Sequence, residues 1–152
     1  MSGPYLTSLS KTGLGGQGDL DKIGSLPPMK LRLRQQARRF RVGIQDQIEI
    51  SDQGEIELEP DEQVTFTADS GSEYDVTRKS WGYYATPSLN TRLPEHGLRP
   101  ALISSSRDRY FIVLVETDSQ IDFLKYLDSD NLDLLCWMDD PISFQSFRMS
   151  AT

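Results

Sequence analysis

The residues best suited to chemistry in this chain lie at positions 81–99, where aromatic, amide and guanidinium side chains occur among glycines and prolines. Aromatic faces stack on sugar C–H surfaces or on bases, and Asn and Arg supply orienting hydrogen bonds. Loop segments of this composition are common binding surfaces. Core packing beneath a long connection also accounts for the aromatic residues. The candidate ligand-binding set is Trp81, Tyr83, Tyr84, Asn90, Arg92 and Arg99.

A second candidate is His96, the single histidine of the chain. Its ordinary pKa near neutrality suits proton transfer to a bound ligand, with Asp75 or Glu95 as the other titrating group. The turn-like surroundings of His96, between Pro94 and Gly97, suit a structural role as well. The nucleophile pattern G-x-S-x-G is absent, so a serine triad is not indicated. Whether the chain is catalytic stays open, with the balance toward a non-catalytic protein.

Metal and cofactor sites are not predicted. The chain has one cysteine, Cys136, and one histidine, which cannot form a His/Cys zinc site without two carboxylates. The stretch from Asp128 resembles the start of a calcium loop, but Leu132 and Asp133 occupy positions that need a ligand and a glycine. Cys136 lies in an apolar run and is expected to be a core thiol.

One formal motif match is the run GLGGQG at residues 13–18, which fits the dinucleotide pattern G-x-G-x-x-G. That pattern binds a pyrophosphate only between a strand and a helix, and no strand precedes this run. About 20 residues later, where a ribose-binding acid is required, the chain has Arg38 and Arg39. The run is therefore interpreted as part of a flexible tail.

Charge is divided unevenly along the chain. Residues 1–41 hold eight Lys/Arg and two Asp, whereas residues 42–152 hold eight Lys/Arg and twenty-one Asp/Glu. The second part, with a net charge of −13, repels a phosphate backbone, so nucleic acid is an improbable partner. No apolar run is long enough to span a membrane, and the N-terminus does not resemble a signal peptide. The single cysteine favours a reducing compartment, so a cytoplasmic protein is expected.

The length of 152 residues and the composition predict one globular domain at residues 42–145. Residues 1–28 are rich in Gly, Ser and Pro and predict a disordered tail, and residues 146–152 a disordered C-terminus. Residues 29–41 form a basic arm whose pattern fits a strand and a helix equally. The arginines of this arm either pair with the acidic domain or hold an acidic partner, with nucleic acid or anionic lipid as weaker alternatives.

Alternating runs at residues 44–50, 55–59 and 63–67 predict a β-meander, and residues 101–104 a further strand. The apolar run at residues 110–115 predicts a strand buried on both faces. A helix is expected at about residues 119–127, with Ile121, Leu124 and Leu127 facing inward, and a strand at residues 132–138. The predicted fold is α+β, a mostly antiparallel sheet, open or curled into a barrel or sandwich, with one C-terminal helix in a strand–helix–strand unit.

The sequences EYDVTRK at 73–79, WGYYATPSLNTRL at 81–93 and GLR at 97–99 resemble an uncharacterised bacterial family. The resemblance covers roughly residues 48–139 and implies a cytosolic context in surface-carbohydrate biosynthesis (lipopolysaccharide or nonulosonic acid). It assigns no activity and no site residues. The expected function is a non-catalytic binding or accessory module with its site at residues 81–99. The alternatives are an acid–base enzyme on a sugar or nucleotide-sugar, and a protein-interaction domain that uses the basic arm.

Overall fold

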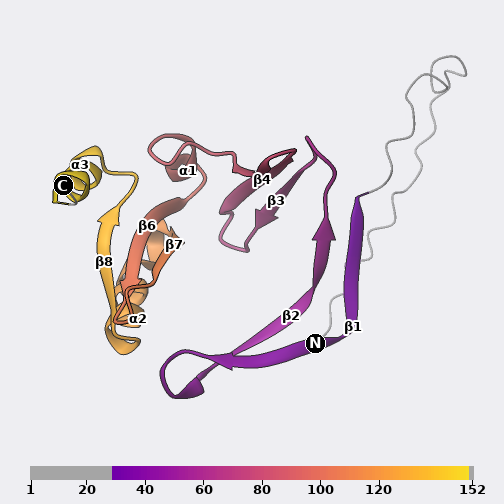
Figure 1. Ribbon diagram of the computed structural model, residues 1–152, viewed down its shortest axis with the longest axis horizontal. Coiled ribbons are helices and arrows are strands. Elements are labelled where there is room, and N and C mark those ends of the chain that lie inside the picture. The colour runs from indigo at the N-terminus through magenta and orange to yellow at the C-terminus, as the bar shows by residue number, and fades with distance from the viewer. Residues whose placement is uncertain (1–28, 151–152) are drawn as a thin grey trace, which may run out of the picture.

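The computed structural model describes residues 29–150, which form an α+β protein with three antiparallel sheets (Figure 1). The predicted α+β class is confirmed, and the strands do not close on themselves. The predicted tail at residues 1–28, with its glycine-rich run, and residues 151–152 lie outside the described residues. No helix in the described part of the chain is long and apolar enough to cross a membrane.

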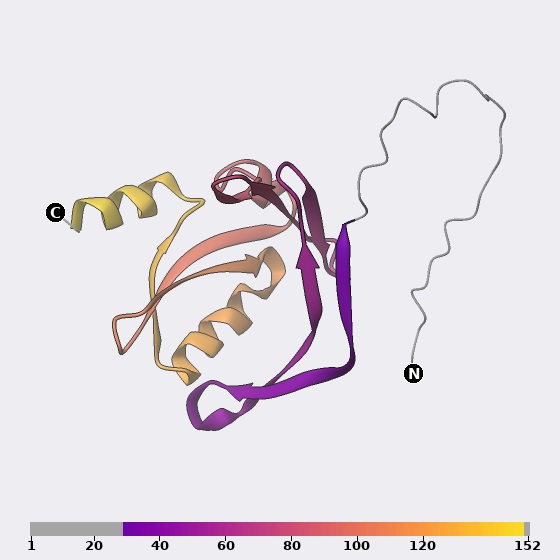
Figure 2. The same cartoon turned by 45° about the vertical axis from the view of Figure 1, so that its right-hand side comes forward.

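The first sheet is a two-stranded ribbon of β1 (Lys30–Val42) and β2 (Ile48–Glu57), joined through the short 3₁₀ helix η2 (Ile44–Asp46). The basic arm is therefore a strand. The register shifts between Leu33 and Arg38, and the ribbon bends sharply along its length (Figure 2). A side chain at Gly54 would collide with the backbone oxygen of Arg32, so close strand contact here requires glycine.

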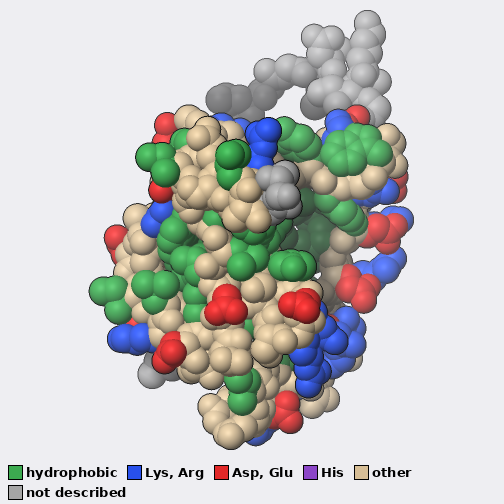
Figure 3. Space-filling view, turned by 60° about the vertical axis from the view of Figure 1, so that its left-hand side comes forward, with side chains coloured by type: hydrophobic (Ala, Val, Ile, Leu, Met, Phe, Trp, Pro, Cys, Tyr) green, Lys and Arg blue, Asp and Glu red, His purple; other side chains and the backbone are tan. Residues whose placement is uncertain are grey.

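The charges of the ribbon are matched across its two strands. Lys30 pairs with Glu57 at 2.9 Å, and Arg34 pairs with Asp52 at 3.1 Å. Arg39 pairs with Glu49, also at 3.1 Å. Basic and acidic side chains alternate along one margin of the molecule, beside a hollow with hydrophobic side chains (Figure 3). The cations of the arm are thus largely neutralised within the ribbon itself.

The second sheet contains β3 (Gln63–Thr67), β4 (Glu73–Lys79) and β5 (Gly82–Ala85), in the order β3-β4-β5. The short helix α1 (Arg92–Glu95) follows and buries Leu93 completely. The segment at residues 81–99 is therefore not one loop. It includes a strand, a turn and a helix before entering the third sheet.

The third sheet has β6 (Leu98–Ser105) at its centre, between β7 (Tyr110–Glu116) and β8 (Leu132–Trp137). The 3₁₀ helix η3 (Thr117–Ser119) and α2 (Gln120–Ser129) connect the two outer strands, so the predicted strand–helix–strand unit is present. The core lies between α2 and this sheet, where Ala101, Ile103 and Leu127 are buried. Partly buried side chains pack around them: Val113, Phe123, Leu132, Leu134 and Trp137.

Two expectations about the third sheet are wrong. The strand at residues 110–115 is an edge strand and not a strand buried on both faces, because β6 takes the central place, and Ile112 is 65% exposed. In α2, Leu127 faces inward as expected, but Ile121 is 71% exposed and Leu124 is also exposed. Phe123, four residues before Leu127, packs on the sheet in their place.

The C-terminal segment forms a helix, α3 (Pro141–Ser150), where the sequence predicted the end of the domain at residue 145 and disorder from residue 146. The Ile142 N–H donates to Asp140 Oδ1 at 2.9 Å, which is an N-cap interaction, and Pro141 occupies the first helical turn. Asp140 and Pro141 together therefore start the helix. Figure 2 shows α3 extending away from the sheets.

Candidate functional site

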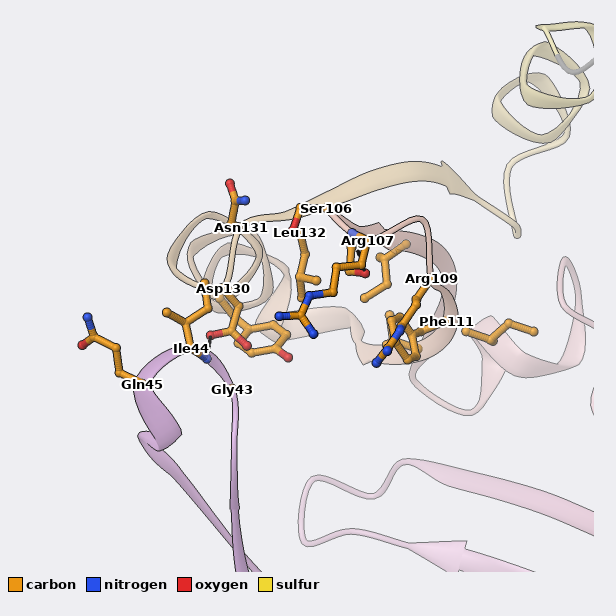
Figure 4. Close-up of a pocket in the computed structure, with 15 residues that line it drawn as sticks. Gly43, Ile44, Gln45, Ser106, Arg107, Arg109, Phe111, Asp130, Asn131 and Leu132 are labelled. Atoms are coloured by element: carbon orange, nitrogen blue, oxygen red, sulfur yellow. Dashed lines mark hydrogen bonds between the residues drawn. The ribbon is translucent and has the colours of Figure 1, made fainter.

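A cavity of about 780 Å³ lies where the tip of the ribbon meets the end of the third sheet (Figure 4). One wall is the β1–β2 turn at residues 43–45. The opposite wall contains the β6–β7 turn and the first half of β7, and the end of α2 with the residues before β8 completes the enclosure. Segments from both ends of the described chain therefore form one site.

The β6–β7 turn positions two arginines at this cavity. The Asp108 N–H donates to Ser105 O at 3.0 Å, and the Ser105 N–H donates to Arg109 O at 2.9 Å. Asp108 has a φ of 55°, the left-handed conformation that follows a type I turn in a three-residue hairpin loop. Arg107 and Arg109 lie on either side of Asp108, and both line the cavity (Figure 4).

The two arginines have no carboxylate partner within ion-pair distance in the part of the chain that the structure describes. Most other cations there are paired, including those of the ribbon, Lys79, Arg92 and Arg99. Arg107 and Arg109 are therefore free to bind an external anion.

The wall opposite the arginines carries hydrogen-bonding groups. Asp130 Oδ1 accepts the N–H of Ile44 at 3.5 Å, which links the ribbon tip to the end of α2. Burial raises the pKa of the Tyr126 hydroxyl, and the neighbouring Asp130 carboxylate raises it further. The Tyr126 hydroxyl thus stays protonated and is held by the Asp130 carboxylate at the cavity wall.

Apolar side chains form the floor of the cavity, with Ile103, Val113 and Leu132 from the core and Phe111 and Ile112 from β7. Neutral polar side chains also line it: Gln45, Ser105, Ser106 and Asn131. A cavity of this size that combines apolar and polar groups is typical of a ligand site. Among the described residues its lining includes two arginines, one carboxylate (Asp130) and the hydroxyls of two serines and one tyrosine. Such a lining can bind a ligand that combines an apolar body with an anionic group.

Three of the six predicted ligand-binding residues lie on the β4–β5 hairpin. Trp81 and Tyr84 meet edge to face, with ring centroids 6.4 Å apart. The Arg78 guanidinium lies over the Tyr83 ring at 5.3 Å. All three aromatic side chains are exposed, at 68%, 67% and 52% for Trp81, Tyr83 and Tyr84, so they do not fill the core.

The two arginines among the other three predicted residues have different partners. Asn90 is exposed in the turn before α1, and Arg92 reaches Asp75 Oδ2 at 3.7 Å. Arg99 donates to both carboxylate oxygens of Asp139, at 2.7 and 3.1 Å, and stacks on Trp137. Of the six, only Tyr83 lines one of the three cavities described here, a space of about 460 Å³ beside the ribbon. Ligand binding by this set stays a prediction.

His96 lies at the C-terminal end of α1, where its Nδ1 is 3.8 Å from Glu73 Oε2. It lines a small cavity of about 240 Å³ together with Glu95, Glu116 and Thr117. Asp75, the other suggested acid–base partner, engages Arg92 instead. The structure thus joins His96 to Glu95 in one cavity and not to Asp75, and its acid–base role stays a prediction.

Sequence reasoning missed Arg107 and Arg109. A signal was present, because SSSRDR at residues 104–109 is a polar turn between two apolar strands and places two cations in an acidic region. This local pattern does not predict the opposite wall of the cavity, because the ribbon tip and the end of α2 are distant in sequence from the β6–β7 turn.

Comparisons with protein-family models, with curated proteins and with solved structures find no match to this chain. Among residues 29–150, no group of three or more His, Cys, Asp or Glu side chains could hold a metal ion. The function is therefore inferred from the geometry of the cavity.

Proposed function

We propose that this protein is a non-catalytic binding module whose ligand combines an anionic group with an apolar body. The ligand occupies the cavity between the ribbon tip and the third sheet. The observation that supports this proposal is the pair of unpaired arginines, Arg107 and Arg109, at the edge of an apolar floor.

The physical reason is the selectivity of a guanidinium pair. Arginine matches a carboxylate or phosphate through two parallel hydrogen bonds, and such charge-assisted bonds contribute roughly 1.5–3 kcal/mol each. The apolar floor adds about 25 cal/mol per Å² of ligand surface removed from water. A neutral ligand of the same shape gains only the second contribution, so the site discriminates by charge.

A matched pair of small probes tests this function. We expect 4-phenylbutyrate to shift the backbone NMR signals of residues 103–113 and 130–132 in a saturable way, and its neutral amide to bind at least about tenfold more weakly. Arg107→Gln combined with Arg109→Gln removes this preference, whereas Arg148→Gln on α3 leaves it unchanged. Equal binding of acid and amide to the unaltered protein contradicts the proposal.

A second candidate function is carbohydrate contact at the β4–β5 hairpin, favoured by the exposure of Trp81, Tyr83 and Tyr84. Aromatic rings with free faces stack on sugars. The test is tryptophan fluorescence during titration with a panel of nucleotide-sugars, repeated with Trp81→Ala. A response that persists in Trp81→Ala assigns the change to Trp137 and removes the hairpin from consideration.

The cellular setting of the module is proposed on separate grounds. The single cysteine supports a reducing, cytoplasmic location. The resemblance at residues 73–99 supports a role in bacterial surface-carbohydrate metabolism.

A further inference from the structure

We propose that the natural ligand of this cavity is an acidic peptide in an extended conformation, which adds as a strand to the outer edge of β7, where no other strand of residues 29–150 pairs. The peptide runs antiparallel to β7, and its C-terminal carboxylate reaches Arg107 and Arg109. This inference depends on the proposed binding function, because it concerns the same cavity, and it specifies the class of ligand.

The first support is the hydrogen-bonding capacity of the β7 edge. β7 is the outer strand in the order β7-β6-β8. The Ser105 N–H donates to Arg109 O, which fixes the hydrogen-bonding phase of the two strands. In antiparallel pairing every second residue of β7 directs its main-chain N–H and C=O toward β6, and Phe111, opposite Ile103, is the first of these. The groups directed outward belong to Tyr110, Ile112 and Leu114.

The second support is the lack of protection along this edge. Proteins usually guard an exposed edge strand with charged side chains, proline, a bulge or a covering segment. β7 has no charged residue and no proline from Tyr110 to Val115. Its register with β6 is continuous, and Tyr110 and Ile112 are each 65% exposed. An unprotected apolar edge suits strand addition by a ligand.

The third support is that the edge lies in the cavity itself. Phe111, Ile112 and Val113 of β7 line the 780 Å³ space, and so does Arg109, which directly precedes the strand. A peptide there meets main-chain donors and acceptors along its length and apolar side chains on its faces. A compact small molecule uses the arginines and the floor but not the outward main-chain groups.

Charge determines the direction of the peptide. Arg107 and Arg109 precede β7, whereas Glu116 ends it and accepts hydrogen bonds from the Ser70 and Ser72 hydroxyls at 2.6 and 3.0 Å. The edge is therefore cationic at its start and anionic at its end. In an antiparallel pair the C-terminus of the added strand lies at the start of β7, where its carboxylate is attracted.

The test uses a fluorescein-labelled heptapeptide, Thr-Val-Thr-Val-Thr-Val-Asp with a free C-terminus, and fluorescence anisotropy with the full chain. We expect saturable binding that weakens at least about tenfold when the C-terminus is amidated and Asp is replaced by Asn. Two further peptides carry N-methyl groups on alternate amides, in the two possible phases. In a peptide paired with β7, every second amide N–H points toward β7. The peptide that is methylated at those amides loses binding, and the peptide methylated at the other amides retains it.

Protein variants identify the edge that is used. Ile112→Pro removes an outward N–H and no bond to β6, so it abolishes peptide binding, while Ile112→Val retains it. Circular dichroism checks the fold of both variants. If Ile112→Pro does not fold, the two methylated peptides still test, with the unaltered protein, whether the peptide pairs with a strand edge.

Three results overturn the inference. The inference is wrong if the peptide shows no saturable binding at concentrations up to about 1 mM. It is also wrong if both methylated peptides bind equally. A dimer in analytical ultracentrifugation that Ile112→Pro dissociates shows that a second copy occupies the edge. If 4-phenylbutyrate still binds through the arginines, the binding function stands and only the peptide class is wrong, whereas loss of both overturns the two proposals together.

Discussion

At the scale of single residues, arginines of the third sheet have opposite roles because of their surroundings. The Arg99 side chain is 23% exposed and donates to Asp139 at 2.7 Å and to Gln120 at 2.9 Å. It connects β6, the start of α2 and the segment after β8. Arg107 lies in a turn and forms no ion pair among the described residues. The first is structural and the second is available to a ligand, although both are Arg in sequence.

We expect Arg99→Ala to lower the free energy of unfolding by about 3 kcal/mol, because it leaves the mostly buried Asp139 carboxylate without its partner. Arg92→Ala is the matched control, since its pair with Asp75 is longer, at 3.7 Å, and half exposed on the arginine side. That control is expected to cost less than about 1 kcal/mol. Urea unfolding measures both, and equal losses contradict a structural role specific to Arg99.

Cys136 is expected to be unreactive in the folded protein. Its side chain is buried, and this burial raises the pKa of the thiol, an effect that a backbone hydrogen bond involving Leu102 only partly offsets. Because the thiolate is the reactive form, Ellman's reagent at pH 8 should modify Cys136 only as fast as the protein unfolds. Asp133→Cys in a Cys136→Ser background, on an exposed position of β8, should react rapidly.

At the scale of elements, the ribbon depends on charge more than on burial. Phe40, Ile48 and Ile50 are each about 40% exposed. A hydrogen bond from Arg34 lowers the pKa of Asp52, and one from Lys30 lowers the pKa of Glu57. A carboxyl group with a lowered pKa stabilises the fold above its ordinary pKa and loses that contribution as pH falls.

The ribbon is therefore expected to loosen in acid before the third sheet does. The ordinary pKa values of Asp52 and Glu57 are 3.8 and 4.5, so their contribution is complete above about pH 5 and is lost as pH falls through the lower native values. Amide NMR signals of β1 and β2, followed from pH 7 to pH 2, report this change. Glu57→Gln should remove part of the pH dependence. Ribbon signals that stay constant throughout this range contradict the expectation.

At the scale of the whole molecule, stability is concentrated in one region. The buried apolar side chains of the third sheet pack against α2, whereas the ribbon meets the rest through the Ile44–Asp130 hydrogen bond and few buried groups. Regions with few buried apolar contacts open at lower free energy than the core. The cavity lies between these two regions, so its width depends on the less stable one.

Native-state hydrogen exchange should show this difference. We expect amides of β1 and β2 to exchange at least about tenfold faster than those of β6 under the same conditions. Asp130→Ala should accelerate exchange near the ribbon tip and leave β6 unchanged, because it removes the link to Ile44. Equal protection of the ribbon and β6 would show that the described chain unfolds as a single unit.

Local sequence patterns predicted much of the fold. The strand at residues 110–115, the helix near residue 120 and the strand at residues 132–138 were predicted, since periodicity and capping are local properties. The helix α3 was not predicted, although Asp140 and Pro141 are standard start signals. The alternating arm was undecidable in isolation, because only pairing with β2 makes it a strand.

The sequence alone determined the α+β class, the acidic domain, the single thiol and the lack of a complete catalytic motif, because these follow from composition and short-range order. Only the tertiary structure decided that β7 is an edge strand, that Arg99 is held by Asp139, and that Arg107 and Arg109 are unpaired beside an apolar cavity. The physical reason is that exposure and ion pairing depend on which segments meet in space, and distant segments meet at this site.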